Sequence, residues 1–339
     1  MGLFLIIMKK IRVAINGFGR IGRVLTRALQ SRDDIELIAI NDLMSVNQIG
    51  LLLRYDSIYR EFDGSVQAKE NCIEIDDQIV YVYGSKDPED LPWGELDIDV
   101  VVDCTGVFRT TEKASRHIAA GAKKVLISAP ASDDSTPTFV FGINHHEMSG
   151  NELVVSNASC TTNCAAPMVK IIHDAYSIKR GFLSTIHAYT GDQRLHDGPH
   201  KDMRRARCAS ENIVPTTTGA TDALVKLFPD LHGRLIGSAI RVPIPVGSLT
   251  EMTLELETSV TVNEVNKLFK SQAEENYGSI LAYTSDPVVS SDIIGNPNSC
   301  IFDSELTSVN GNMVKIWGWY DNETGYSNRL VDMIGEIGR

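Results

Sequence analysis

The chain has 339 residues, of which 43% are hydrophobic and 22% charged, with 44 acidic and 32 basic side chains and a net charge of −12. At about 150 residues per domain, this length predicts two domains. The composition excludes disordered, collagen-like and disulfide-scaffold proteins. The acidic balance argues against nucleic acid or an anionic membrane as the main partner, although it leaves room for a local basic pocket.

The cysteines and the N-terminal segment bear on the cellular compartment of the protein. Six cysteines, at positions 72, 104, 160, 164, 208 and 300, lack framework spacing, which favours a reducing compartment. No apolar run approaches the ~20 residues of a membrane helix. The charges of the N-terminal run lie on the wrong side for a secretory signal. We expect a protein of a reducing compartment whose natural chain opens at Met8, with residues 1–7 an overlong start.

The first half of the chain alternates strand and helix patterns. We predict strands at 11–15, 35–40, 99–103 and 124–127, helices at 22–29, 47–55 and 111–121, and a hairpin at 72–83. Such alternation predicts a mostly parallel, doubly wound sheet with helices on both faces, as in Rossmann-type α/β domains.

The second half has longer strands and fewer helices. We predict strands at 182–186, 238–242, 251–256 and 314–320, and helices at 220–227, 261–275 and 325–339. This pattern predicts an α+β domain with a large, mostly antiparallel sheet. The predicted domains are therefore 8–157 and 158–324, with a final helix at about 325–339.

A glycine-rich turn opens the first domain. Gly17, Gly19 and Gly22 form G-x-G-x-x-G between a strand and a helix, and Asp42 follows 20 residues later at the end of the second strand. This context is the dinucleotide-binding fingerprint. Because the Asp42 carboxylate suits a ribose diol and repels a 2′-phosphate, we expect NAD rather than NADP. The alternatives are a glycine turn without ligand and a loop-capping aspartate.

Cys160 is the candidate nucleophile. It lies after a strand and at the start of an apolar helical run that contains Pro167, which should kink the helix or leave a bond unmade. A helix N-terminus lowers the pKa of a thiol and favours the thiolate. Cys164, one turn on, is interpreted as a buried structural cysteine. The C-x-x-x-C spacing lacks further ligand partners, so we expect no metal.

His187 is the best partner for Cys160 among eight histidines, because it ends an apolar strand and begins a loop. Lone histidines are also often structural. Basic residues gather at 200–207, which can equally be a solvated face. Hydroxyls at 216–218 with Gly219, and Arg241 at a strand end, suit phosphate.

These motifs resemble phosphorylating, NAD-dependent glyceraldehyde-3-phosphate dehydrogenases from about residue 8 to the C-terminus. The resemblance rests on INGFGRIG at 15–22, SNASCTTN at 156–163, HAYTGDQ at 187–193, DGPHKD at 197–202 and WYDNETGY at 319–326. It implies oxidation and phosphorylation of glyceraldehyde 3-phosphate to 1,3-bisphosphoglycerate in glycolysis, through a thioester on Cys160 with His187 as base. It further implies a cytoplasmic homotetramer.

The resemblance also implies binding residues. The NAD site would comprise Arg20, Ile21, Asp42, Lys86, Ser128, Asn322 and Tyr326, besides the three glycines. Inorganic phosphate would bind to Ser159, Thr161, Thr218 and Gly219. The substrate phosphate would bind to Thr190 and Arg241, and Arg205 would lie close to these two residues. The segment from about 181 to 209 would be a loop reaching a neighbouring subunit's cofactor, and the final helix would pack on the first domain.

Two alternatives stay open. Erythrose-4-phosphate dehydrogenases are similar, but they differ after the catalytic histidine, where Tyr189, Thr190 and Gly191 follow the glyceraldehyde-3-phosphate type. A secondary, non-catalytic binding role is also compatible with the sequence. Residues 245–251 depart from the family pattern, which puts local sheet contacts in doubt.

Overall fold

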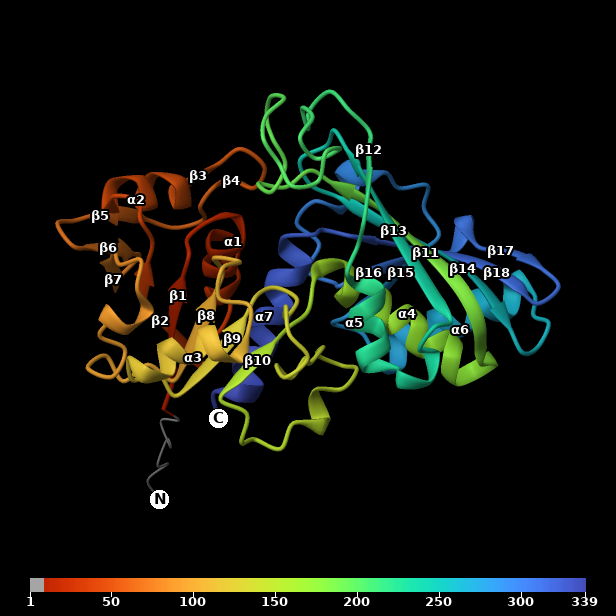
Figure 1. Ribbon diagram of the computed structural model, residues 1–339, viewed down its shortest axis with the longest axis horizontal. Coiled ribbons are helices and arrows are strands. Elements are labelled where there is room, and N and C mark those ends of the chain that lie inside the picture. The colour runs from red at the N-terminus through yellow and green to blue at the C-terminus, as the bar shows by residue number, and fades with distance from the viewer. Residues whose placement is uncertain (1–8) are drawn as a thin grey trace, which may run out of the picture. The chain divides into compact units, whose positions relative to one another are not determined.

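The computed structural model describes residues 9–339, which form two compact units (Figure 1). Unit 1 comprises residues up to 137, 148–157 and 330–339, and unit 2 comprises 138–147 and 158–329. The predicted boundaries 8–157 and 158–324 differ at 138–147, and as independent domains they stay a prediction. The expected start at Met8 lies outside the described residues.

Unit 1 contains an eight-stranded sheet in the order β10-β9-β8-β1-β2-β7-β6-β5. The strands from β10 to β7 are parallel, and β7, β6 and β5 are antiparallel. The bounds are β1 (Ile11–Asn16), β2 (Ile35–Asn41), β5 (Val66–Ala68), β6 (Cys72–Ile75), β7 (Gln78–Tyr83), β8 (Val100–Asp103), β9 (Lys124–Ile127) and β10 (Val154–Ser156). A separate two-stranded ribbon joins β3 (Tyr55–Asp56) and β4 (Arg60–Glu61).

The helices α1 (Arg20–Leu29), α2 (Val46–Arg54) and α3 (Thr111–Ala119) connect these strands. Strands β1, β2 and β8 are almost wholly buried, as expected of the central strands of a parallel sheet. Their carboxyl ends, at Asn16, Asn41 and Asp103, share one edge, which is where ligands bind in open α/β sheets. The predicted Rossmann-type α/β class is confirmed.

Unit 2 contains the second sheet, in the order β12-β13-β11-β14-β18-β16-β15, with β17 beside β18. All pairs are antiparallel except β11 with β13 and β15 with β16. The bounds are β11 (Ile178–Ala188), β12 (Val214–Thr216), β13 (Leu235–Val242), β14 (Ser248–Leu256), β15 (Leu281–Thr284), β16 (Cys300–Asp303), β17 (Ser308–Asn310) and β18 (Met313–Tyr320). The expected large, mostly antiparallel sheet is confirmed.

Helices α4 (Cys160–Tyr176), α5 (Ala220–Leu227) and α6 (Val262–Glu275) belong to the same unit, and α4 packs against both of the others and against the sheet. Helix α4 continues through Pro167, so the proline leaves a backbone bond unmade without ending the helix. Helix α7 (Thr324–Ile337) begins in unit 2, and its residues from Leu330 on belong to unit 1.

Three features of the structure bear on the expectations from the sequence. Strand β11 extends to Ala188, so residues 181–188 are strand, and the segment expected to be a loop starts only after them. Within residues 9–339, no helix is long and apolar enough to cross a membrane. The six cysteines, all among these residues, form no disulfide.

Candidate active site

Cys160 is the first residue of α4, in unit 2. Ser159 caps this helix, because its hydroxyl accepts a hydrogen bond from the Thr162 N–H at 3.0 Å. The preceding residue, Ala158, has φ of +55°, a conformation uncommon for a residue with a side chain. The Tyr326 hydroxyl donates to the Ala158 carbonyl at 2.9 Å. The turn that presents the thiol is therefore held from the C-terminal helix.

His187 lies opposite the thiol, on β11. Its Nε2 is 3.4 Å from Cys160 Sγ, and only 4% of the residue is exposed. The structure thus brings together the two residues predicted to be catalytic. The distance is within reach for proton transfer from a sulfur atom to a ring nitrogen.

Tyr320 bridges the elements that carry this pair. Its hydroxyl lies 2.9 Å from Thr161 Oγ1 on α4 and 2.8 Å from Thr185 Oγ1 on β11. All three side chains are buried. The Thr161 hydroxyl, which we expected to face phosphate, is therefore engaged with Tyr320, and sequence reasoning did not single out Tyr320.

Arg241, on the neighbouring strand β13, contacts the far side of the imidazole. Its Nη1 lies 2.9 Å from His187 Nδ1, 3.1 Å from the Ala188 carbonyl oxygen and 3.4 Å from Thr190 Oγ1. His187 Nδ1 is itself 2.7 Å from the Ala188 oxygen. The Ala188 oxygen can only accept and Arg241 can only donate, so the two compete for Nδ1. A proton on Nδ1 is donated to Ala188 and leaves the Nε2 lone pair facing Cys160, whereas a lone pair on Nδ1 accepts from Arg241 and puts the proton on Nε2. The first form is the one that can act as a base toward the thiol.

Burial favours the neutral form of both partners. Burial raises the pKa of Cys160 to about 11, while the Arg241 charge acts in the opposite direction. Burial, followed by the Arg241 charge, lowers the pKa of His187 to about 3. The cost of desolvating the charge opposes the effect of the helix N-terminus, which favours the thiolate. The thiolate expected from the sequence stays a prediction.

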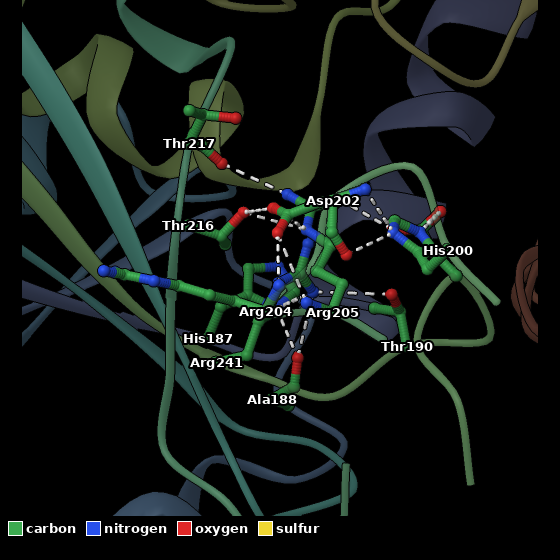
Figure 2. A network of polar contacts seen from close by, with 11 residues as sticks. His187, Ala188, Thr190, His200, Asp202, Arg204, Arg205, Thr216, Thr217 and Arg241 are labelled. Atoms are coloured by element: carbon green, nitrogen blue, oxygen red, sulfur yellow. Dashed lines mark hydrogen bonds and ion pairs between the residues drawn. The ribbon is translucent and has the colours of Figure 1, made fainter. Parts of the chain in front are cut away.

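Arg205 lies within a dense polar network (Figure 2). It donates to Asp192 at 2.7 Å, to the Thr216 hydroxyl at 3.0 Å and to the Thr217 carbonyl at 3.2 Å. The Thr216 hydroxyl in turn donates to Asp202 at 2.6 Å. The guanidinium therefore anchors the segment after β11 to β12, and an anion would have to compete with Asp192 for it.

Three further predicted residues lie on the same unit. The Thr218 hydroxyl accepts from the Ala220 N–H at 3.1 Å, and Gly219 begins α5 without a side-chain cap. A Cβ built at Gly219 would meet nothing within 4 Å. An uncapped, open helix start of this kind suits an anion. Thr190 follows β11 and contacts Arg241, as described above.

Comparison with known proteins places this chain in a family. Residues 11–111 match the model of the glyceraldehyde 3-phosphate dehydrogenase NAD-binding domain, and residues 159–322 match that of its C-terminal domain. The chain is 52% identical over 332 residues to glyceraldehyde-3-phosphate dehydrogenase of Streptomyces coelicolor, covering 97% of this chain and 98% of the relative. The corresponding protein of Clostridium acetobutylicum is 48% identical over 326 residues, 94% and 96% of the two chains. The chain belongs to the glyceraldehyde-3-phosphate dehydrogenase family. It is an NAD-dependent dehydrogenase.

The glycine-rich loop of unit 1 fits the NAD of this family. Gly17 has φ of +93°, and a Cβ there would lie 2.9 Å from the Cys104 backbone. A Cβ at Gly22 would lie 2.4 Å from the Gly17 carbonyl oxygen. Gly19 caps α1 without a side chain and has open space where a Cβ would be. Two glycines are thus required by packing, and the third leaves room for a pyrophosphate.

Asp42 lies beside that loop, at the end of β2. Its carboxylate accepts from the Phe18 N–H at 2.6 Å and from the Met44 N–H at 3.0 Å. Each oxygen retains an accepting position for a ribose hydroxyl. The Arg20 side chain forms an ion pair with Asp56 and lies over the Tyr59 ring. Arg20 and Ile21 are the first two residues of α1, so their backbone N–H groups belong to the helix start that follows the loop.

The other predicted cofactor residues belong to different units. Lys86 is exposed after β7, and Ser128, after β9, donates its N–H to the Asp103 carbonyl at 2.9 Å. Asn322 and Tyr326 belong to unit 2 and are buried. Asn322 accepts from the Ser248 hydroxyl at 2.9 Å and from the Gly247 N–H at 3.3 Å. Among the described residues, no cluster of three metal-binding side chains occurs.

Proposed function

We propose that this protein oxidises glyceraldehyde 3-phosphate with NAD and inorganic phosphate to 1,3-bisphosphoglycerate, the reaction that glycolysis uses. The observation that carries the proposal is the Cys160 thiol, 3.4 Å from His187 Nε2 at the start of α4. A thiol beside a neutral imidazole whose other nitrogen is hydrogen-bonded is an activated nucleophile.

In the first half-reaction, sulfur attacks the aldehyde carbon while His187 Nε2 accepts the thiol proton. The oxygen of the resulting hemithioacetal receives a proton, which it later returns to His187 as the carbon loses hydride. Bound NAD supplies the acceptor for that hydride. The Cys160 N–H at the helix start and His187 stabilise the oxyanion.

In the second half-reaction, inorganic phosphate attacks the thioester carbon. The carbon–sulfur bond breaks, the acyl phosphate leaves, and the sulfur regains a proton from His187. We assign inorganic phosphate to Ser159, Thr218, Gly219 and the backbone N–H of Thr161, because the Thr161 hydroxyl is engaged with Tyr320. We assign the substrate phosphate to Arg241 and Thr190, with Arg205 holding the segment around them.

We assign NAD to the loop with Gly17, Gly19 and Gly22, to the first N–H groups of α1 at Arg20 and Ile21, and to Asp42. Lys86, Ser128, Asn322 and Tyr326 complete the proposed set by family resemblance. The carboxylate of Asp42, already held by two backbone N–H groups, supports a preference for NAD over NADP.

We further propose that the protein is a cytoplasmic homotetramer. The face of the second sheet opposite α4 exposes Phe182 and Ile236, which are direct neighbours on β11 and β13 and are 60% and 61% exposed. Leu195, Met203 and Ile213 are also exposed between β11 and β12. Exposed apolar surface of this kind is typical of an association interface.

The decisive experiment is NADH formation by the purified protein with glyceraldehyde 3-phosphate or erythrose 4-phosphate, with and without inorganic phosphate. We expect rapid, phosphate-dependent turnover of glyceraldehyde 3-phosphate. Higher catalytic efficiency with erythrose 4-phosphate would select the alternative dehydrogenase.

A further inference from the structure

We infer that Ser248 is a positioning residue that orients both the Asn322 amide and the base His187. It is the first residue of β14, it is fully buried, and it lies in the stretch 245–251 that departs from the family pattern. The inference rests on the proposed function, because it takes Asn322 as a cofactor residue.

The direction of each hydrogen bond at Ser248 follows from its partners. The Ala188 N–H lies 3.1 Å from Ser248 Oγ and can only donate, so the hydroxyl accepts there. The hydroxyl proton is then free for Asn322 Oδ1, 2.9 Å away. Ser248 therefore links Ala188 on one side to Asn322 on the other.

A second donor determines which way the Asn322 amide faces. The Gly247 N–H also points to Oδ1, at 3.3 Å. With two donors on its oxygen, the amide must turn its NH2 group to the other side. Asn322 is thereby set to donate to a carbonyl oxygen, such as that of a nicotinamide carboxamide.

The backbone at Gly247 requires a glycine. Its φ is +93°, and a Cβ there would lie 2.4 Å from the Ser290 carbonyl oxygen. No other residue adopts this geometry without strain. Gly247 therefore allows the backbone to present its own N–H and the Ser248 hydroxyl to Asn322 together. Gly247 and Ser248 together form a cradle for Asn322.

The other end of the chain of bonds reaches His187. The regular pairing of β11 with β14 ends at Ile186 and Leu249, and beyond it the Ser248 hydroxyl takes the Ala188 N–H. Ala188 is the residue whose carbonyl accepts from His187 Nδ1 at 2.7 Å. If Ala188 were displaced, Nδ1 would lose its acceptor and would accept a hydrogen bond from Arg241 instead. The imidazole proton would then lie on Nε2, and the ring would no longer offer a base to Cys160.

A double-mutant cycle on the full-length enzyme tests both arms. NAD binding is measured by calorimetry without aldehyde, and kcat is measured at saturating NAD. We expect Ser248→Ala to raise the NAD Kd about tenfold, as expected for the loss of one hydrogen bond, and to lower kcat. In an Asn322→Ala background, Ser248→Ala should leave the Kd unchanged but still lower kcat.

Ser304→Ala is the matched control, because Ser304 is also buried and its hydroxyl donates to the Thr284 carbonyl at 2.8 Å. It should change neither quantity. Equal Kd effects of Ser248→Ala in both backgrounds, or an unchanged kcat, would overturn the inference. The calorimetric part of the cycle measures NAD binding without any aldehyde. A wild-type protein that bound NAD but failed to oxidise glyceraldehyde 3-phosphate would therefore refute only the proposed function.

A second variant keeps the amide orientation testable if Ser248→Ala fails to fold. Asn322→Asp removes the NH2 donor but keeps an acceptor. The probe is NADH, whose reduced nicotinamide ring is uncharged. Asn322→Asp should weaken NADH binding as much as Asn322→Ala does. If Asn322→Asp bound NADH as tightly as the wild type, the amide would face the other way and the inference would be wrong.

Discussion

Cys164 lies one helical turn beyond Cys160 on α4, yet the two thiols have opposite surroundings. Cys160 is partly exposed beside His187, whereas Cys164 is fully buried, with its sulfur 3.6 Å from the Gly318 carbonyl oxygen. Burial and the neighbouring Cys300 raise the pKa of Cys164 well above its usual value. A neutral, buried thiol is a packing group.

Serine substitutions of the two cysteines should therefore affect activity differently. We expect Cys160→Ser to abolish oxidation, because a hydroxyl is a far weaker nucleophile at neutral pH, and Cys164→Ser to leave substantial activity. NADH formation and iodoacetamide labelling followed by peptide mapping measure this. If Cys164 is labelled first, or if its variant is the inactive one, the nucleophile has been misassigned.

Alkylation of Cys160 should depend steeply on pH. With the pKa raised to about 11 by burial, the thiolate fraction of the ligand-free enzyme grows about tenfold per pH unit between pH 7 and 10. Because the Arg241 charge lowers this pKa, Arg241→Gln should raise it and slow alkylation at pH 8. The measurement is the iodoacetamide rate across that range. A rate that levels off near pH 7 would contradict the assignment.

Mutations in the two phosphate sites should have different kinetic effects. Arg241→Ala removes charge-assisted hydrogen bonds worth about 1.5–3 kcal/mol, so kcat/KM should fall about ten- to a hundred-fold more for glyceraldehyde 3-phosphate than for glyceraldehyde. Thr218→Ala should instead raise the KM for inorganic phosphate. Equal losses on both aldehydes would assign Arg241 a role only through His187, which it contacts at 2.9 Å.

Cofactor preference should follow the charge of Asp42. Asp42→Asn retains an oxygen for the Phe18 N–H but removes the charge that repels a 2′-phosphate. The ratio of kcat/KM for NADP to that for NAD should rise. Asp34→Asn, in the loop before β2, is the control, since Asp34 pairs with Arg32 at 2.7 Å. A wild type equally efficient with both cofactors would contradict the role of Asp42.

Tyr320→Phe tests the bridge between α4 and β11. It leaves the buried hydroxyls of Thr161 and Thr185 without this partner, so we expect a loss of about 1–3 kcal/mol in the free energy of unfolding and a lower kcat. Denaturant titration and steady-state kinetics measure the two effects. Tyr283→Phe, whose ring stacks on Phe302 at 6.0 Å in the same unit, should leave kcat unchanged. Unchanged stability in Tyr320→Phe would show that the bridge is dispensable.

The sequence predicted those features that depend on residues close together in the chain. Periods of two and 3.6 residues located strands such as β11 and helices such as α6, because burying one face of an element imposes its period locally. The glycine loop and Asp42 were readable for the same reason, since a turn, a helix start and a strand end follow one another within a short segment.

Partnerships between distant residues were decided only by the tertiary structure. Thr161 meets Tyr320 across 159 positions and Ser248 meets Asn322 across 74, and no local pattern signals which hydroxyl fills which buried position. The same holds for the pKa of Cys160. The sequence places it at a helix start, which favours the thiolate, but the fold removes much of the water around its sulfur, and this desolvation raises the pKa. The sequence by itself therefore predicted the nucleophile, its base and the glycine loop, and the packing of distant elements decided their partners and the surroundings that set their protonation.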